Sequence, residues 1–123
     1  MTRITIAAGG LSVAAELNDS PTARAIVDAL PITATANLWG DEIYFEIPVR
    51  VAQSPDARAD VEVGDLAYWP VGHAFCIFFG PTPVSSGDKP RAASPVNVVG
   101  QVLDGTEQFR DVEYGTEISI ALA

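Results

Sequence analysis

Apolar and polar side chains alternate without a break from Glu42 to Val51. Successive side chains of a β-strand point to opposite faces, so this segment is predicted to be a strand with one apolar face. The apolar positions are Ile43, Phe45, Ile47, Val49 and Val51, and the polar positions are Glu42, Tyr44, Glu46 and Arg50. Pro48 has no N–H to give to a neighbouring strand, so an edge, a bulge or a bend is expected there.

Shorter patterns of the same kind predict further strands. Alternation on both sides of Gly9-Gly10 indicates a hairpin that opens the chain and ends near residue 17. Strands are also expected at 66–69, 75–79, 96–102 and 118–122, and the continuously apolar run 75–79 is typical of a strand buried on both faces. Residues 54–60 and 81–95 are predicted to be loops, the second exposed and mobile.

One helix is predicted between Ser20 and Pro31. Ser20 is a suitable N-cap and Pro21 suits the first helical position, while Pro31 ends the helix. Apolar residues follow the spacing of one helical face, at Ala23, Ile26, Val27 and Leu30. A second, short helical turn is expected around Phe109, between residues 105 and 112.

These elements favour a mainly β fold. The chain has 123 residues, of which 48% are hydrophobic, which suits one domain over residues 1–123 with one core. Many short strands with one clear helix predict a compact, closed β-barrel of about eight strands, because closure removes exposed strand edges.

The balance of charge excludes several classes of partner. Seven Lys and Arg against sixteen Asp and Glu give a net charge of −9, which repels phosphate backbones and anionic lipids, so neither nucleic acid nor a membrane is expected as a partner. A single cysteine, Cys76, and a single histidine, His73, cannot build an ordinary zinc site, so no metal and no cofactor is expected. Without a signal-type apolar segment, the expected compartment is the cytoplasm.

The aromatic side chains gather in one region. Residues 66–83 carry five of the ten aromatics together with the only histidine and the only cysteine. The segments 38–48, 64–72 and 78–83 resemble the small prokaryotic cyclophilin-like proteins, an atypical family of largely unknown function. In order along the chain, the resemblance extends from the helix at 23–31 through 95–100 to the final strand. It implies a cyclophilin-type barrel capped by a helix.

The main functional hypothesis is a soluble binding protein with an aromatic cleft for a small molecule or an extended, proline-containing peptide. The residues predicted to line the cleft are Trp39, Glu42, Tyr44, Tyr68, Trp69, His73 and Phe75. Each has a structural alternative: core packing for the rings, a solvated face for Glu42 and an exposed turn for His73. The Trp69-Pro70 bond is of the kind that can be cis.

Two alternatives remain. Ordinary cyclophilins are peptidyl-prolyl isomerases, so the resemblance implies an isomerase with a non-standard site, which needs a proline pocket and a donor beside the twisted amide. The usual Phe-His-Arg triplet is absent, and Arg50 is the candidate donor, although a lone strand arginine also suits a surface ion pair. The second alternative is a structural module that forms homo-oligomers through its aromatic side chains.

Overall fold

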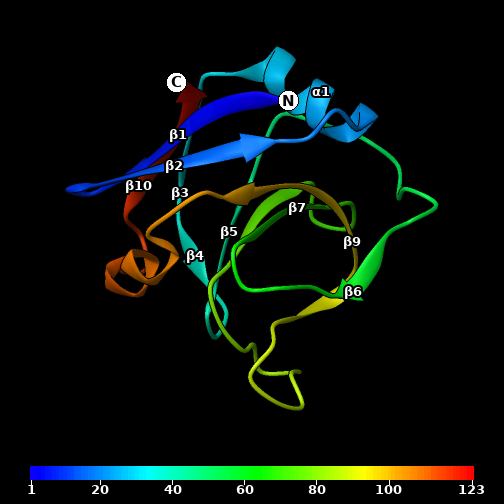
Figure 1. Cartoon of the computed structure of the whole chain (residues 1–123), viewed down its shortest axis with the longest axis vertical. Coiled ribbons are helices and arrows are strands. Elements are labelled where there is room, and N and C mark those ends of the chain that lie inside the picture. The colour runs from blue at the N-terminus through cyan, green and yellow to red at the C-terminus, as the bar shows by residue number, and fades with distance from the viewer.

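The computed structural model describes residues 1–123 and contains ten strands and two short helices. The strands are β1 (Thr2–Ala8), β2 (Leu11–Leu17), β3 (Ile32–Thr35), β4 (Asn37–Leu38), β5 (Glu42–Glu46), β6 (Arg58–Asp60), β7 (Asp65–Trp69), β8 (Ala74–Phe78), β9 (Arg91–Val102) and β10 (Glu117–Leu122). The helices are α1 (Pro21–Ala29) and the 3₁₀ helix η1 (Thr106–Asp111). Figure 1 shows α1 and both chain ends at one end of the molecule, with the loop between β8 and β9 projecting at the other.

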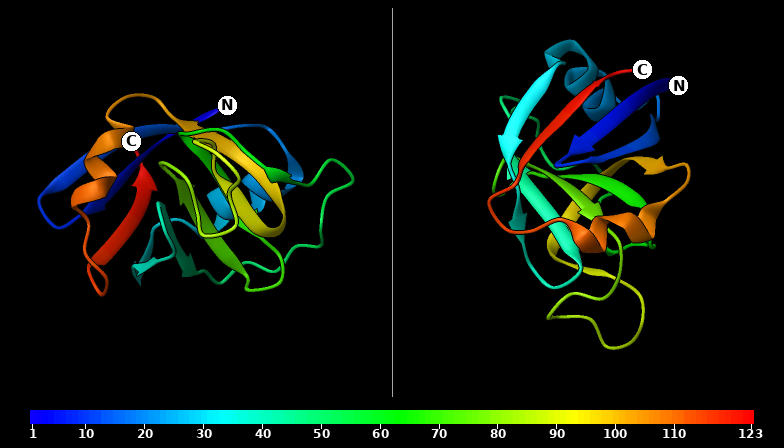
Figure 2. Two further views of the ribbon diagram at one scale, coloured as in Figure 1. Left: turned by 90° about the horizontal axis from the view of Figure 1, so that it is seen from below. Right: turned by 90° about the vertical axis from the view of Figure 1, so that its left-hand side faces the viewer.

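All strand pairs are antiparallel and form one strongly curved sheet (Figure 2). The order is β3-β10-β1-β2-β9-β7-β8-β5-β4, and β6 pairs with β9 beside this path. No ladder joins the edge strands β3 and β4 to each other. The prediction of a mainly β fold is therefore confirmed, but the prediction of a closed barrel of about eight strands is wrong.

The path of residues 32–38 explains why the sheet stays open. β3 pairs with β10 and β4 pairs with β5, so one short segment supplies both edges of the sheet. Ala36, between the two strands, donates its N–H to the Thr116 carbonyl at 2.8 Å and accepts from the Gly115 N–H at 2.9 Å. Successive pieces of one extended segment lie end to end and cannot form a ladder with each other.

The predicted helices and the first hairpin are confirmed. The Ser20 side chain accepts a hydrogen bond from the Ala23 N–H at 3.2 Å, as an N-cap does, and α1 begins at Pro21. The helix ends at Ala29, just before Pro31. η1 buries Phe109 near the middle of its six residues, and β1 and β2 pair along their full length on either side of Gly9-Gly10.

The central strands have two buried faces, which we call the core face and the pocket face. On the core face, Phe45, Phe75 and Ile77 join a cluster of 24 buried residues that includes Ile26 of α1. On the pocket face, a cluster of 6 buried residues contains Val61, Ala67, Cys76, Phe78, Ala92 and Val96. All five residues of β8 are buried, so the prediction of a strand covered on both faces is confirmed.

Several predicted boundaries need correction. β5 has the predicted alternation but ends at Glu46, before Pro48. β9 begins at Arg91, within the segment predicted to be a loop up to Pro95, because its first half pairs with β6. β6 itself lies in the other predicted loop, and β3 and β4 have no counterpart in the prediction. The cis peptide bond is Leu30-Pro31, so Trp69-Pro70 is trans.

Candidate ligand pocket on the pocket face

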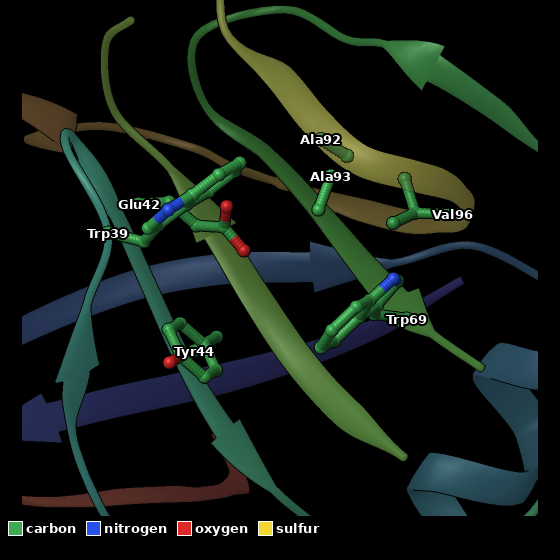
Figure 3. A pocket seen from close by; sticks show the side chains of 7 residues that line it. All are labelled: Trp39, Glu42, Tyr44, Trp69, Ala92, Ala93 and Val96. Atoms are coloured by element: carbon green, nitrogen blue, oxygen red, sulfur yellow. The ribbon is translucent and has the colours of Figure 1, made fainter. Parts of the chain in front are cut away.

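A cavity of about 240 Å³ opens on the pocket face between the β4–β5 hairpin, β7 and the first half of β9. Its lining is mostly apolar and consists of Trp39, Glu42, Tyr44, Trp69, Ala92, Ala93 and Val96. In Figure 3 the Glu42 carboxylate points into the space between the rings of Trp39 and Tyr44 on one side and Trp69 on the other. Both tryptophans of the chain therefore line this one cavity.

The turn between β4 and β5 brings Trp39 and Glu42 together. Each donates its backbone N–H to the other's carbonyl, at 2.9 and 3.2 Å, so the two residues are directly opposite and share a face of the hairpin. Gly40 occupies the turn with φ +59°, and a Cβ there would come within 2.9 Å of the Thr82 backbone. A side chain at position 40 would thus be both strained and crowded, which makes glycine the suitable residue.

Trp69 forms the opposite wall of the pocket and is held from two sides. Its indole Nε1–H donates to the Ser94 hydroxyl at 2.6 Å, which ties the end of β7 to β9. Gly72 lies against the ring, where an added Cβ would come within 2.6 Å of two ring carbons. The ring is therefore held in one position before any ligand arrives, and its own donor is already used.

Glu42 is the one acidic side chain of the pocket, and it is only 6% exposed. Burial raises its pKa from 4.5 to about 7, because the charged carboxylate loses contact with water. The neighbouring Cys76 thiol has the opposite and smaller effect on that pKa. Burial, together with the nearby carboxylate, raises the pKa of Cys76 well above its usual value, so this thiol stays protonated at neutral pH.

No basic side chain of the protein neutralises Glu42. Five of the seven Lys and Arg side chains pair with other carboxylates, and the ion pairs are Arg3–Glu16, Arg58–Asp65, Lys89–Glu62, Arg91–Asp60 and Arg110–Asp41. The two that remain, Arg24 and Arg50, are exposed and do not line the cavity. Glu42 is therefore a buried carboxyl group whose polar neighbour is a thiol rather than a cation.

The structure brings together four of the seven side chains that the sequence predicted for a cleft, namely Trp39, Glu42, Tyr44 and Trp69. Tyr68 and Phe75 lie on the core face and are fully buried there, because they occupy the alternate positions of β7 and β8. The Tyr68 hydroxyl donates to the Val49 carbonyl at 2.7 Å. These two rings therefore stabilise the fold and do not border the cavity.

His73 and Arg50 form a separate corner. The Arg50 Nη1 lies 3.0 Å from Nδ1 and 3.1 Å from Nε2 of His73, and neither residue lines the pocket. His73 has a positive φ of 50°, as fits its place in the turn between β7 and β8. Arg50 is exposed and has no carboxylate partner, so it does not form the surface ion pair that was the alternative prediction for it.

Sequence reasoning missed the wall formed by Ala92, Ala93 and Val96, together with Ser94, which fixes Trp69. Residues 92–94 fell in the segment predicted to be a loop, and small side chains give little hydrophobic periodicity. No group of three or more His, Cys, Asp or Glu side chains is placed to hold a metal ion. Neither α1 nor η1 has the length and apolar character of a membrane-spanning helix.

Comparison with known proteins agrees with the resemblance seen in the sequence. A family model described as cyclophilin-like matches residues 2–121. A hypothetical protein of Archaeoglobus fulgidus, whose structure was determined in solution, has 42% sequence identity and a TM-score of 0.83, with 99% of this chain and 95% of that chain covered. No curated protein matches the chain. The extent of these two matches shows that this chain belongs to the cyclophilin-like family.

Proposed function

We propose that this protein binds a small organic molecule in the cavity on the pocket face. The observation that carries the proposal is the Glu42 carboxyl group, which lies in an aromatic cavity without a cation from the protein. Burying such a group costs stability, because the apolar surroundings disfavour its charge. Perturbed titratable groups in an apolar pocket are a characteristic feature of binding and catalytic sites.

The cavity suits a ligand with an apolar body and one polar group. The walls offer two indole rings and one phenol ring, and Glu42 offers one carboxyl group at their centre. A volume of about 240 Å³ suits a small molecule or a single side chain better than a length of peptide. Of the two ligand types expected from the sequence, the small molecule is therefore favoured.

The tryptophans provide a direct test of binding. A library of small organic compounds is screened by ¹H–¹⁵N NMR, in which the chain's two indole N–H signals, from Trp39 and Trp69, both report on the pocket. We expect hits that shift both signals. Hits that shift only amides of the loop at residues 81–90, or the absence of any hit, would overturn the proposal.

A matched pair of variants separates pocket binding from surface binding. Ala93→Leu fills the mouth of the cavity from an exposed position and is expected to abolish binding of the hits. Ala52→Leu adds the same volume at an exposed position outside the pocket and is expected to leave binding unchanged. Equal affinities of the two variants would place the binding site elsewhere.

The two alternative functions lack a comparable observation. No arginine lines the pocket, and the candidate donor Arg50 lies against His73. The largest exposed apolar side chains come from separate elements and loops, among them Val63, Val71, Leu103 and Tyr114. Prolyl isomerisation and homo-oligomer formation stay predictions, checked by an X-Pro exchange assay and by sedimentation at several concentrations.

A further inference from the structure

We infer that the ligand of this pocket is a small organic cation, a protonated or methylated amine, whose charge lies against Glu42 and between the rings of Trp39, Tyr44 and Trp69. This inference rests on the proposed function and names the chemical class of its ligand. It follows from three properties of the pocket, namely its charge, its aromatic walls and the lack of a neutralising group inside it.

The charge of the pocket excludes anions and favours cations. Glu42 is the only acidic side chain that lines the pocket, and no Lys or Arg lines it. The whole chain carries a net charge of −9, so the surrounding field also attracts positive ligands and repels negative ones. A carboxylate or phosphate ligand would meet repulsion here without any compensating donor of positive charge.

The aromatic walls favour a cation over a neutral donor. A cation near the face of an aromatic ring is attracted by the ring's quadrupole, most strongly at tryptophan, and the attraction grows when water is excluded. Rings stand on both sides of the Glu42 carboxylate in Figure 3, so a cation beside that carboxylate also meets ring surfaces. The bond from Trp69 to Ser94 holds one of these rings in place in advance.

A cation also relieves the cost of ionising Glu42, which a neutral ligand does not. Binding of a positive charge favours the carboxylate form, so the affinity rises with pH until Glu42 is fully ionised. The charged and titratable groups nearest to Glu42 come from three strands and one turn. Cys76 on β8 stays a thiol, because burial raises its pKa. Tyr44 on β5 lines the same pocket, while Arg91 on β9 and Asp41 in the β4–β5 turn are each held in an ion pair elsewhere.

Two probes of the same shape test this inference. Choline carries a trimethylammonium group, and 3,3-dimethylbutan-1-ol replaces its nitrogen by carbon and so has no charge. Titrations at pH 8.5 are followed by the fluorescence of the two tryptophans, both of which line the pocket. We expect choline to bind at least about tenfold more tightly than the alcohol.

Two further variants assign the preference to Glu42. Glu42→Gln keeps the shape of the side chain and is expected to weaken choline at least about tenfold, with little effect on the alcohol. Glu46→Gln removes a charge from an exposed position on the same strand and is expected to leave both affinities unchanged. A short peptide with one trimethyllysine forms a third arm. If this peptide binds more tightly than choline, the trimethylammonium group that the pocket recognises belongs to a protein partner.

The outcomes separate this inference from the proposed function. Equal affinities for the two probes, or unchanged choline affinity in Glu42→Gln, would overturn the cation and leave a pocket for neutral molecules. If neither probe binds, the inference of a cationic ligand is also overturned. The library screen then decides independently whether the pocket binds any ligand. Choline affinity that does not rise between pH 6 and pH 8 would also contradict the inference.

Discussion

The two faces of the central strands are built from alternate residues of the same segments, yet they differ in chemistry. In β8, Phe75 and Ile77 join the 24-residue cluster of the core face, whereas Cys76 and Phe78 join the 6-residue cluster of the pocket face. On the core face, the buried hydroxyl of Tyr68 is held by hydrogen bonds to the backbone. The pocket face leaves a cavity with Glu42 inside it.

This difference shows where stability and function separate in the molecule. The side chains of the core face are packed and hydrogen-bonded within the protein, so a substitution there removes packing or a hydrogen bond and lowers stability. On the pocket face a carboxyl group lies in apolar surroundings at a cost to stability, as is typical of sites that keep an interaction free for a ligand.

Truncation on the core face should be the most damaging change. Phe75 is fully buried and stacks on Phe45 with ring centroids 5.5 Å apart. Phe75→Ala is expected to lower the free energy of unfolding by about 3–5 kcal/mol, measured by urea denaturation, because it leaves a cavity in a packed core. Val71→Ala, at a position that is 71% exposed, should change it by less than about 0.5 kcal/mol. Similar losses in both variants would contradict the assignment of the core face.

Glu42 should give the pocket face a pH dependence that the core face lacks. Its pKa is raised from 4.5 to about 7, so between these values the folded state binds more protons than the unfolded state. Stability then falls as the pH rises from about 4.5 to 7 and stays low above it, by roughly 3 kcal/mol in total. Glu42→Gln removes this term.

The difference in free energy of unfolding between the wild type and Glu42→Gln separates the contribution of Glu42 from those of the fifteen other acidic side chains. The two proteins should have similar free energies of unfolding near pH 4, and the variant should be the more stable near pH 8. Urea denaturation at several pH values measures this difference. The exposed Glu46→Gln serves as the control and should show no such trend, and a flat difference for Glu42→Gln would mean that Glu42 is not buried in solution.

The elements with strong local signals were predictable from the sequence. The cap at Ser20, the turn at Gly9-Gly10 and the alternation of β5 each depend on a few adjacent residues, and the structure has all three. Closure of the sheet depends instead on which strands meet after folding. No local pattern marks Ala36 as the point where the chain passes from one edge of the sheet to the other. Short strands such as β4 and β6 form because of the strands that they pair with.

The pocket was predictable only in part, for the same reason. The alternation of β5 placed Glu42 and Tyr44 on one face, but it did not tell whether that face was solvated or covered. What covers it is the first half of β9, whose small residues gave no strand pattern. The aromatic run at 66–79 contributed one residue to the pocket and most of its rings to the core, because consecutive residues of a strand point to opposite faces.

A smaller effect is expected from the hydroxyl of Tyr68 on the core face. It donates to the Val49 carbonyl at 2.7 Å and accepts from the Val51 N–H at 3.3 Å, which ties the chain after β5 to the core. Tyr68→Phe should cost about 1–2 kcal/mol and speed hydrogen exchange at the Val51 amide, because the buried Val49 carbonyl and the part-buried Val51 N–H both lose their partner. Tyr114→Phe, at a side chain that is 74% exposed, should do neither.

The mildest change should act on the pocket face without disturbing the core face. The Ser94 hydroxyl accepts the Trp69 indole N–H at 2.6 Å, so Ser94→Ala frees the ring that forms one wall of the cavity. The loss of one part-buried hydrogen bond should cost about 1 kcal/mol of stability. A ligand that uses this ring should bind a few-fold more weakly, because the ring is no longer held in place before binding. Ser94→Thr keeps the hydroxyl and should retain both the indole chemical shift and the affinity. An unchanged Trp69 indole signal in Ser94→Ala would mean that packing against Gly72 and other neighbours holds the ring without the hydrogen bond. The pocket face would then depend on packing, as the core face does, and this contrast between the two faces would be smaller.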